Sequence, residues 1–222
     1  MILILRGHIR NAFTTPDLKI WVAAVHKLCP DLTIYVHTWN VFANTISWRH
    51  VPGNATRVTE KTITDYFQEV SPLIQHIMIE DDAHLPLIGN VVGKINNYMA
   101  PIKGWKNYWY GKYQIVHHVT HQPIHFQEMI INTRFDVMQI PFNPLTHDQM
   151  LSFIQENQGK VFTKNKFMYD EQHAGIDNLY VGNIHTMFQL THHFYYHLDD
   201  ILEKHHLDVQ ENLVFVMNDE LF

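Results

Sequence analysis

An arginine and an aspartate stand two positions apart at the end of an apolar run near the middle of the chain. The run is Glu128–Val137, and it closes with Arg134, Phe135 and Asp136. Successive side chains on a β-strand alternate faces, so we expect Arg134 and Asp136 to project the same way. A carboxylate there can hold a divalent metal ion, and a guanidinium beside it can hold a phosphate. A plain surface ion pair at a strand end is the alternative.

A second apolar run starts the chain and also ends in polar residues. Ile2–Leu5 is followed by Gly7, His8 and Arg10. A glycine permits a tight turn or the close approach of a ligand, and an arginine can reach a nucleotide phosphate. The alternative is an ordinary turn, because neither the Gly-x-Gly-x-x-Gly fingerprint nor a Gly-x-x-x-x-Gly-Lys-Ser/Thr phosphate loop is present.

The run Leu32–His37 leads into Trp39 and Asn40. A tryptophan after a strand can form the wall of a pocket for a ring, and asparagine can recognise polar edges. Core packing is the alternative role for Trp39. We predict that Trp39 contacts a bound nucleotide.

The run Ile74–Glu80 ends in the consecutive carboxylates of Glu80, Asp81 and Asp82. Adjacent carboxylates repel each other unless a metal, an arginine or a sugar hydroxyl compensates them. A solvated acidic turn is the alternative. We predict that Glu80 holds the nucleoside base or ribose.

Segments with helical spacing separate these runs. One begins at Thr14–Asp17, where Leu18, Trp21 and Val22 start an apolar face. The other expected elements are helices over 59–66, 147–158 and 177–204, a helix broken near Pro101 and Gly104 over 88–113, an extended segment over 160–167, and a late strand or helix turn over 212–216. Alternating strands and helices predict one α/β domain over residues 1–222, with a mostly parallel central sheet flanked by helices. The polar residues after the four runs would then meet at the carboxyl edge of that sheet, where ligands bind.

The composition excludes several classes of protein. The chain has 222 residues, a net charge of −6 and scattered lysines and arginines, which argues against nucleic acid as a partner. A single cysteine excludes an intramolecular disulfide framework. The apolar runs are too short for a transmembrane segment, and Met1–Leu5 has the wrong flanks for a signal peptide. We therefore expect a cytoplasmic protein.

Histidine is unusually frequent, with 18 residues. His117, His118, His121 and His125 lie close together in the sequence, which raises the possibility of zinc. No His-Glu-x-x-His motif is present, and a structural zinc site is the less favoured reading.

Four segments, in order, carry a resemblance to a known family: Ile4–Arg10, Tyr35–Asn40, Ile131–Val137 and Asp177–Gly182. The chain resembles GT-A-type glycosyltransferases of bacterial surface-polysaccharide loci and large DNA viruses. The resemblance implies a GT-A-like (Rossmann-like) fold and an enzyme of glycan biosynthesis, viral or bacterial. Such an enzyme transfers a sugar from a nucleotide-sugar donor to a hydroxyl of a glycan or glycoprotein acceptor, in the host cytoplasm if the chain is viral.

The resemblance also implies a metal site. GT-A enzymes usually carry Asp-x-Asp after the fourth strand, and the last carboxylate holds Mn²⁺ or Mg²⁺ against the diphosphate. This chain keeps that last carboxylate as Asp136 but has Arg134 in place of the first. The departure leaves a second possibility, in which Arg134 meets the diphosphate directly and does part of the work of the metal.

Asp177, at the expected start of a helix, is the candidate general base that would activate the acceptor hydroxyl. A helix N-cap is its alternative role. Two alternatives to the transferase also remain. One is a non-catalytic nucleotide- or sugar-binding module with the same fold, and the other is a nucleotide-sugar hydrolase.

Overall fold

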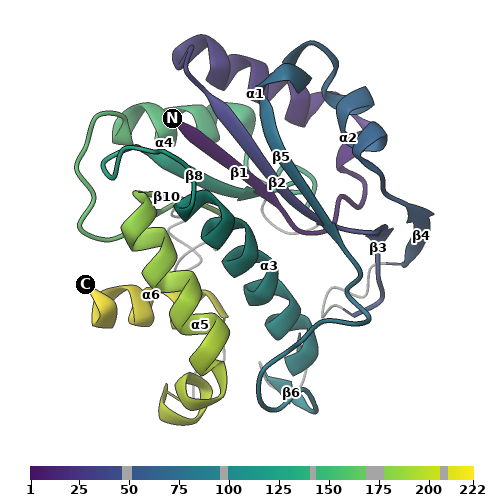
Figure 1. Cartoon of the computed structure of the whole chain (residues 1–222), viewed down its shortest axis with the longest axis vertical. Helices are drawn as coiled ribbons and strands as arrows, with labels where there is room; N and C mark the ends of the chain where they lie inside the picture. Colours follow the sequence, from purple (N-terminus) through teal and green to yellow (C-terminus); the bar gives the residue numbers. More distant parts are fainter. Residues whose placement is uncertain (47–51, 96–99, 141–143, 169–177, 206–209) are drawn as a thin grey trace.

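The chain forms a mixed sheet of six strands in the order β5-β2-β1-β8-β10-β9 (Figure 1). The computed structural model describes residues 1–46, 52–95, 100–140, 144–168, 178–205 and 210–222. The strands are β1 (Ile2–Arg6), β2 (Thr33–Trp39), β5 (Ile74–Glu80), β8 (Ile130–Arg134), β9 (Lys166–Phe167) and β10 (Leu179–Gly182). β1 pairs in parallel with both β2 and β8, and β2 pairs in parallel with β5, whereas β10 is antiparallel to β8 and β9. The predicted α/β class with a mostly parallel sheet is confirmed.

Helices cover both faces of the sheet (Figure 1). The helices are α1 (Asp17–Leu28), α2 (Glu60–Phe67), α3 (Ile102–Thr120), α4 (His147–Asn157), α5 (Ile184–His205) and α6 (Gln210–Leu221). Side chains of a strand alternate between faces, so Leu3 and Leu5 of β1 join the core under α1, α2 and α4. Ile2 and Ile4 join a second core under α3, α5 and α6. One sheet therefore carries two hydrophobic cores, and the expectation of a single domain stays a prediction.

The expected starts of three helices, α1, α2 and α4, agree with the structure. α1 buries Leu18, Trp21 and Val22 on the sheet, as their spacing predicts. Thr59 and Thr146 cap α2 and α4, and each forms a reciprocal capping box with the residue three positions later. These local signals fix where the helices begin, and burial of one face holds them on the sheet.

The segment over 88–113 differs from the prediction. Lys94–Ile95 (β6) and Ala100–Pro101 (β7) pair as short antiparallel strands, and α3 then runs without a break to Thr120. Pro101 precedes the helix, where its missing N–H costs nothing, and Gly104 lies inside it. The glycine penalty of about 1 kcal/mol is outweighed by burial of aromatic side chains further along the helix.

The segment over 177–204 also differs. The described chain resumes at Asn178, and Leu179–Gly182 forms β10 before α5 begins at Ile184. All four residues of β10 are buried, so this strand has no alternating pattern that would separate it from a helix. Of the extended segment expected over 160–167, only Lys166–Phe167 forms a strand, β9. Residues 212–216, expected as a late strand or helix turn, lie in helix α6. A 3₁₀ helix covers Gln68–Leu73.

The remaining short elements lie outside the main sheet. They are a 3₁₀ turn, Ala12–Thr14, and an antiparallel pair formed by β3 (Val41–Ala43) and β4 (Asn54–Arg57). Within the described ranges, no helix is both long and apolar enough to cross a membrane.

Candidate functional site

The polar residues that follow the four parallel strands share one edge of the sheet. The register aligns Arg6 at the end of β1 with His37 of β2 on one side and with Arg134 of β8 on the other. Trp39 at the end of β2 is aligned with Glu80 at the end of β5. The structure therefore places these strand ends at one edge of the sheet, as the sequence predicts, and the binding roles of the residues there stay predictions.

Arg134 and Asp136 form a bidentate ion pair. Arg134 Nε donates to Asp136 Oδ1 at 2.7 Å, and Arg134 Nη2 donates to Asp136 Oδ2 at 2.7 Å. The expectation that Arg134 and Asp136 project the same way because they alternate along a strand is wrong. β8 ends at Arg134, and Asp136 lies in the turn that follows. The turn brings the carboxylate back onto the guanidinium, and this produces the contact that alternation was expected to give.

Arg10 reaches the same carboxylate from the loop after β1. Its Nη1 donates to Asp136 Oδ2 at 3.2 Å, although the two residues are 126 positions apart. The loop turns through Gly7, whose φ of +88° is readily available only to glycine. Arg10 itself has a φ of +51°, and its backbone N–H donates to Phe42 O at 2.8 Å.

This cluster of Arg10, Arg134 and Asp136 is mostly buried. The side chains expose 15%, 14% and 5% of their surface, so the carboxylate is the deepest of the three. Burial is the largest influence on Arg10 and lowers the pKa of its guanidinium, and the neighbouring charge of Arg134 lowers it further while Asp136 raises it. Removing one charged partner from such a buried ion pair typically lowers the free energy of unfolding by about 3–5 kcal/mol.

A second group at this edge joins His37, Glu80 and Tyr110. The Glu80 carboxylate lies 2.8 Å from His37 Nε2 through one oxygen and accepts from Tyr110 OH at 2.7 Å through the other. Burial alone would raise the pKa of Glu80, but the hydrogen bonds from His37 and Tyr110 bring it below its usual value. Burial and the same carboxylate raise the pKa of Tyr110 far above its usual value. Glu80 therefore stays ionised and oriented, with 26% of its side chain exposed.

His8 and Asp82 form a third contact beside this group. His8 Nε2 lies 3.4 Å from Asp82 Oδ2, which also accepts from the side-chain amide of Asn44. Burial lowers the pKa of His8, more than Asp82 raises it. Trp39 is buried between His8 and His37, with ring centroids 5.9 and 4.9 Å away. The core-packing role of Trp39 is therefore observed, and its contact with a nucleotide stays a prediction.

Neither His37 nor Tyr110 is among the site residues predicted from the sequence. His37 lies inside β2, whose residues from Ile34 to Trp39 are all buried, and its position two residues before Trp39 was the available signal. Tyr110 lies on α3, and nothing in its local sequence indicates that it faces Glu80.

Two further cations are buried under the site. Lys112 is fully buried, with its Nζ 4.0 Å from the ring centroid of Tyr108 and 4.2 Å from that of Trp109. Arg6 Nε donates to Asn132 Oδ1 at 2.7 Å, and its Cζ lies 4.7 Å from the Tyr108 centroid. Both cations therefore lie near the Tyr108 ring, where cation–π attraction stabilises them.

Asp177 lies outside the described residues, so its role as a base stays a prediction. The next residue, Asn178, lies at the carboxyl end of β8. Its carbonyl oxygen accepts from Arg134 N at 3.3 Å and from Thr133 Oγ1 at 2.9 Å, and its side-chain oxygen accepts from Arg134 Nη1 at 3.4 Å. The described part of the chain therefore resumes at Asn178, in contact with Arg134.

The described residues at Asp136 fit an anion better than a metal ion. Both carboxylate oxygens already accept hydrogen bonds from guanidinium groups. In the described part of the chain, no three or more His, Cys, Asp or Glu side chains come together in a way that could hold a metal ion. Binding of Mn²⁺ or Mg²⁺ by Asp136 stays a prediction.

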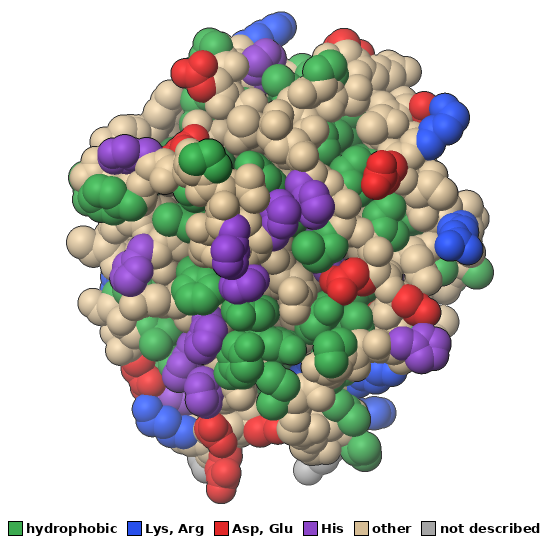
Figure 2. Space-filling view, viewed as in Figure 1, with side chains coloured by type: hydrophobic (Ala, Val, Ile, Leu, Met, Phe, Trp, Pro, Cys, Tyr) green, Lys and Arg blue, Asp and Glu red, His purple; other side chains and the backbone are tan. Residues whose placement is uncertain are grey.

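Many of the histidines lie on α3, α5 and the edge strand β5. Figure 2 shows histidine side chains gathered on the face where α3 and α5 lie. The rings of His76 and His118 stack with centroids 3.9 Å apart, and those of His117 and His121 are 4.6 Å apart. Burial and the neighbouring imidazoles lower the pKa values of His118, His192 and His193.

These lowered pKa values predict a loss of stability in mild acid. The folded chain binds fewer protons than the unfolded chain below the ordinary histidine value of 6.5, so stability is full above that value and falls as pH decreases through it. Urea unfolding measured from about pH 8 to about pH 5 should show this fall. The triple variant His118→Gln, His192→Gln and His193→Gln should show a flatter dependence of stability on pH. An unchanged dependence would contradict the prediction. Other titratable groups that influence these histidines are His76, His117, His121, His197, Asp200 and Glu220, and His192 also influences His193.

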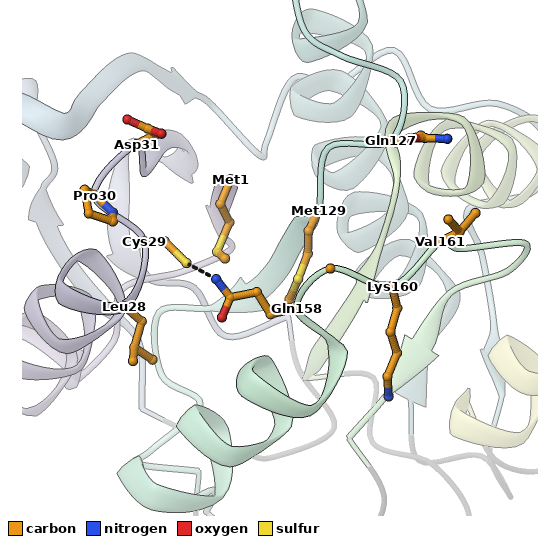
Figure 3. Close-up of a pocket in the computed structure, with 11 residues that line it drawn as sticks. Met1, Leu28, Cys29, Pro30, Asp31, Gln127, Met129, Gln158, Lys160 and Val161 are labelled. Carbon is orange, nitrogen blue, oxygen red and sulfur yellow. Dashed lines mark hydrogen bonds between the residues drawn. The ribbon is translucent and has the colours of Figure 1, made fainter.

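A pocket of about 450 Å³ lies at the opposite, amino edge of the sheet (Figure 3). Its lining includes Met1 and Met129, which precede β1 and β8, and Cys29, which precedes β2. Gln158 Nε2 donates to Cys29 Sγ at 3.2 Å. Burial raises the pKa of the Cys29 thiol, which keeps it protonated and unreactive near neutral pH.

The chain was compared with family models, curated proteins and solved structures. No family model matches the chain, and no curated protein matches it. Among solved structures, an active-site mutant of LgtC is 10% identical, with a TM-score of 0.42 over 98% of this chain and 70% of that chain. The galactosyltransferase LgtC in complex with donor and acceptor sugar analogues is 9% identical, with a TM-score of 0.39 over 97% and 69% of the two chains.

Proposed function

We propose that the chain is a GT-A-like glycosyltransferase that moves a sugar from a nucleotide-sugar donor to a hydroxyl of a glycan acceptor. The observation that carries the proposal is the meeting of Arg10, Arg134 and Asp136 at the carboxyl edge of the parallel sheet. Ligands of open α/β sheets bind at this edge. The His37–Glu80–Tyr110 group at the same edge supplies an oriented carboxylate for hydroxyl groups of the ligand.

The chemistry of sugar transfer suits these groups. The donor loses a nucleoside diphosphate, and negative charge develops on that leaving group as the glycosidic bond breaks. A fixed cation near the diphosphate stabilises this charge more in the transition state than in the ground state. The acceptor hydroxyl attacks the anomeric carbon of the donor sugar and gives up its proton, and Asp177 is the proposed base if configuration is inverted.

A binding module without turnover is the second candidate. The replacement of the first carboxylate of Asp-x-Asp by Arg134 favours it, because a guanidinium there can hold a nucleotide without supporting transfer. A nucleotide-sugar hydrolase would differ from both, since it would release the nucleotide without an acceptor.

The first test is a thermal-shift panel of UDP, GDP, CMP, dTDP and their sugars, each with and without Mn²⁺. A ligand that binds only the folded chain raises its melting temperature. The donor identified in this way is then incubated with candidate glycan acceptors, and transfer is measured. Acceptor-dependent release of nucleotide supports the transferase, and binding without release supports the module.

Asp177→Asn should keep the nucleotide-induced thermal shift and lose transfer. Neutral asparagine cannot accept the acceptor proton, while its size is unchanged. Asp65→Asn on α2 is the matched control, because Asp65 is exposed and pairs only locally with Lys61. Unchanged turnover in Asp177→Asn would overturn the assignment of the base.

A further inference from the structure

The Arg10–Arg134–Asp136 cluster is built from the ends of two neighbouring strands. Arg134 ends β8 and Arg10 follows β1, and these strands pair in parallel. The two guanidinium groups share one carboxylate, whose oxygens accept at 2.7, 2.7 and 3.2 Å. Asp136 thereby holds two like-charged groups close to each other.

The carboxylate lies below the arginines. Asp136 exposes 5% of its side chain, whereas Arg10 and Arg134 each expose about three times as much, at 15% and 14%. Guanidinium surface in this cluster is therefore more accessible to a ligand than carboxylate surface. Guanidinium groups bind phosphate oxygens in a bidentate manner and stay charged at all physiological pH values.

The backbone of Arg10 is held in an unfavourable conformation. Its φ of +51° lies in the left-handed region, which costs a residue other than glycine about 1 kcal/mol. The hydrogen bond from Arg10 N to Phe42 O at 2.8 Å helps to hold this conformation. Such strain concentrates at functional sites, and the guanidinium of this residue contacts Asp136.

A divalent cation is difficult to place on Asp136 in this arrangement. It would bind a carboxylate oxygen at about 2.0–2.6 Å, closer than the guanidinium nitrogens already lie. The cation would then be next to two positive groups, so at least one arginine would have to leave.

We propose that Arg10 and Arg134 bind the diphosphate of the donor directly, that Asp136 is a positioning residue for these arginines, and that no divalent cation is needed for this contact. The identity of the ligand as a donor rests on the proposed function, whereas binding of a diphosphate group does not. The arginines would stabilise the charge that develops on the departing nucleoside diphosphate.

The test is calorimetric titration of the full chain with inorganic pyrophosphate and with the nucleoside diphosphate chosen by the panel, in EDTA and in Mn²⁺. We expect binding in EDTA. Arg10→Ala and Arg134→Ala should each weaken it by about tenfold or more, since hydrogen bonds to charged groups are lost. Arg57→Ala, on exposed β4, is the matched control and should bind as the unmodified chain does.

Additional variants separate positioning from folding. Arg134→Gln combined with Asp136→Asn removes both charges, so it avoids a buried carboxylate without its partner, and it should fold and bind weakly. Asp136→Asn alone should keep binding in EDTA that is detectable but weaker, because the arginines keep their charge and lose their orientation. If Asp136 were a metal ligand, its variant would instead lose a component of binding that requires Mn²⁺.

The results distinguish this proposal from the proposed function. Binding that EDTA abolishes and Mn²⁺ restores overturns direct binding by the arginines, even if sugar transfer is observed. Arginine variants that fold and bind as tightly as the Arg57→Ala control overturn it as well. Pyrophosphate binding in EDTA without any sugar transfer supports the arginine contact and counts against the transferase.

Discussion

Gly111→Ala is expected to destabilise the protein and to weaken nucleotide binding. A Cβ at this position would lie 2.5 Å from His37 Cε1 and 2.8 Å from His37 Nδ1. His37 is fully buried and lies 2.8 Å from Glu80, so its ring has no space into which to move without disturbing that carboxylate. Overpacking lowers the free energy of unfolding by about 1–3 kcal/mol. The higher helix propensity of alanine offsets about 1 kcal/mol of this loss. Urea unfolding and the nucleotide-induced thermal shift measure the two effects.

Gly104→Ala is the matched control on the same helix. Its Cβ would meet Ile46 O at 3.4 Å and Ile46 Cγ2 at 3.5 Å, which are ordinary contact distances. This variant should be neutral or more stable by up to about 1 kcal/mol, because alanine favours the helix. If both variants behaved alike in stability and binding, the close packing of α3 on His37 would not be needed for the site.

Trp109→Ala is expected to cause the largest loss of stability. Trp109 is fully buried and stacks on Phe194 of α5, with centroids 3.9 Å apart and ring planes within 3° of parallel. Replacing a buried tryptophan by alanine costs about 3–5 kcal/mol, a large fraction of a typical folding stability of about 5–15 kcal/mol. Urea unfolding measures the loss directly.

Two controls accompany Trp109→Ala. Ile20→Ala removes a half-exposed side chain of α1 and should change stability by no more than about 0.5 kcal/mol. Trp109→Phe keeps an aromatic ring against Phe194 and should cost less than the alanine variant. A loss below about 1 kcal/mol for Trp109→Ala would show that α3 and α5 are not held together by this stack.

The sequence was most informative where pattern and burial agree. Leu18, Trp21 and Val22 repeat at helical spacing because one face of α1 is buried, and this helix was predicted closely. β10 was missed because helices or strands bury both of its faces, which removes alternation. The unbroken α3 was missed because a local glycine penalty at Gly104 was given more weight than packing.

The site was predictable only in part, for a related reason. The parallel strands end at or shortly before four residues of the site, which are Arg10, Glu80, Arg134 and Asp136. The strand order and direction therefore place these residues at one edge of the sheet. Tyr110 could not be predicted, because its contact with Glu80 depends on the rotation of α3 about its own axis. That rotation is set by contacts such as the one between Gly111 and His37, which are remote in sequence.

The position of β1 in the sheet affects how the site is lost when the protein opens. β1 is hydrogen-bonded to β2 on one side and β8 on the other, and both of its neighbours carry residues of the site. Backbone amides in such interior strands exchange with solvent mainly through global unfolding rather than by local fraying. Arg134, which ends β8, and the strand β1 that leads to Arg10 are therefore expected to lie in the slowest-exchanging part of the molecule. Ligand recognition at this edge should persist through partial opening of the periphery and disappear together with the sheet.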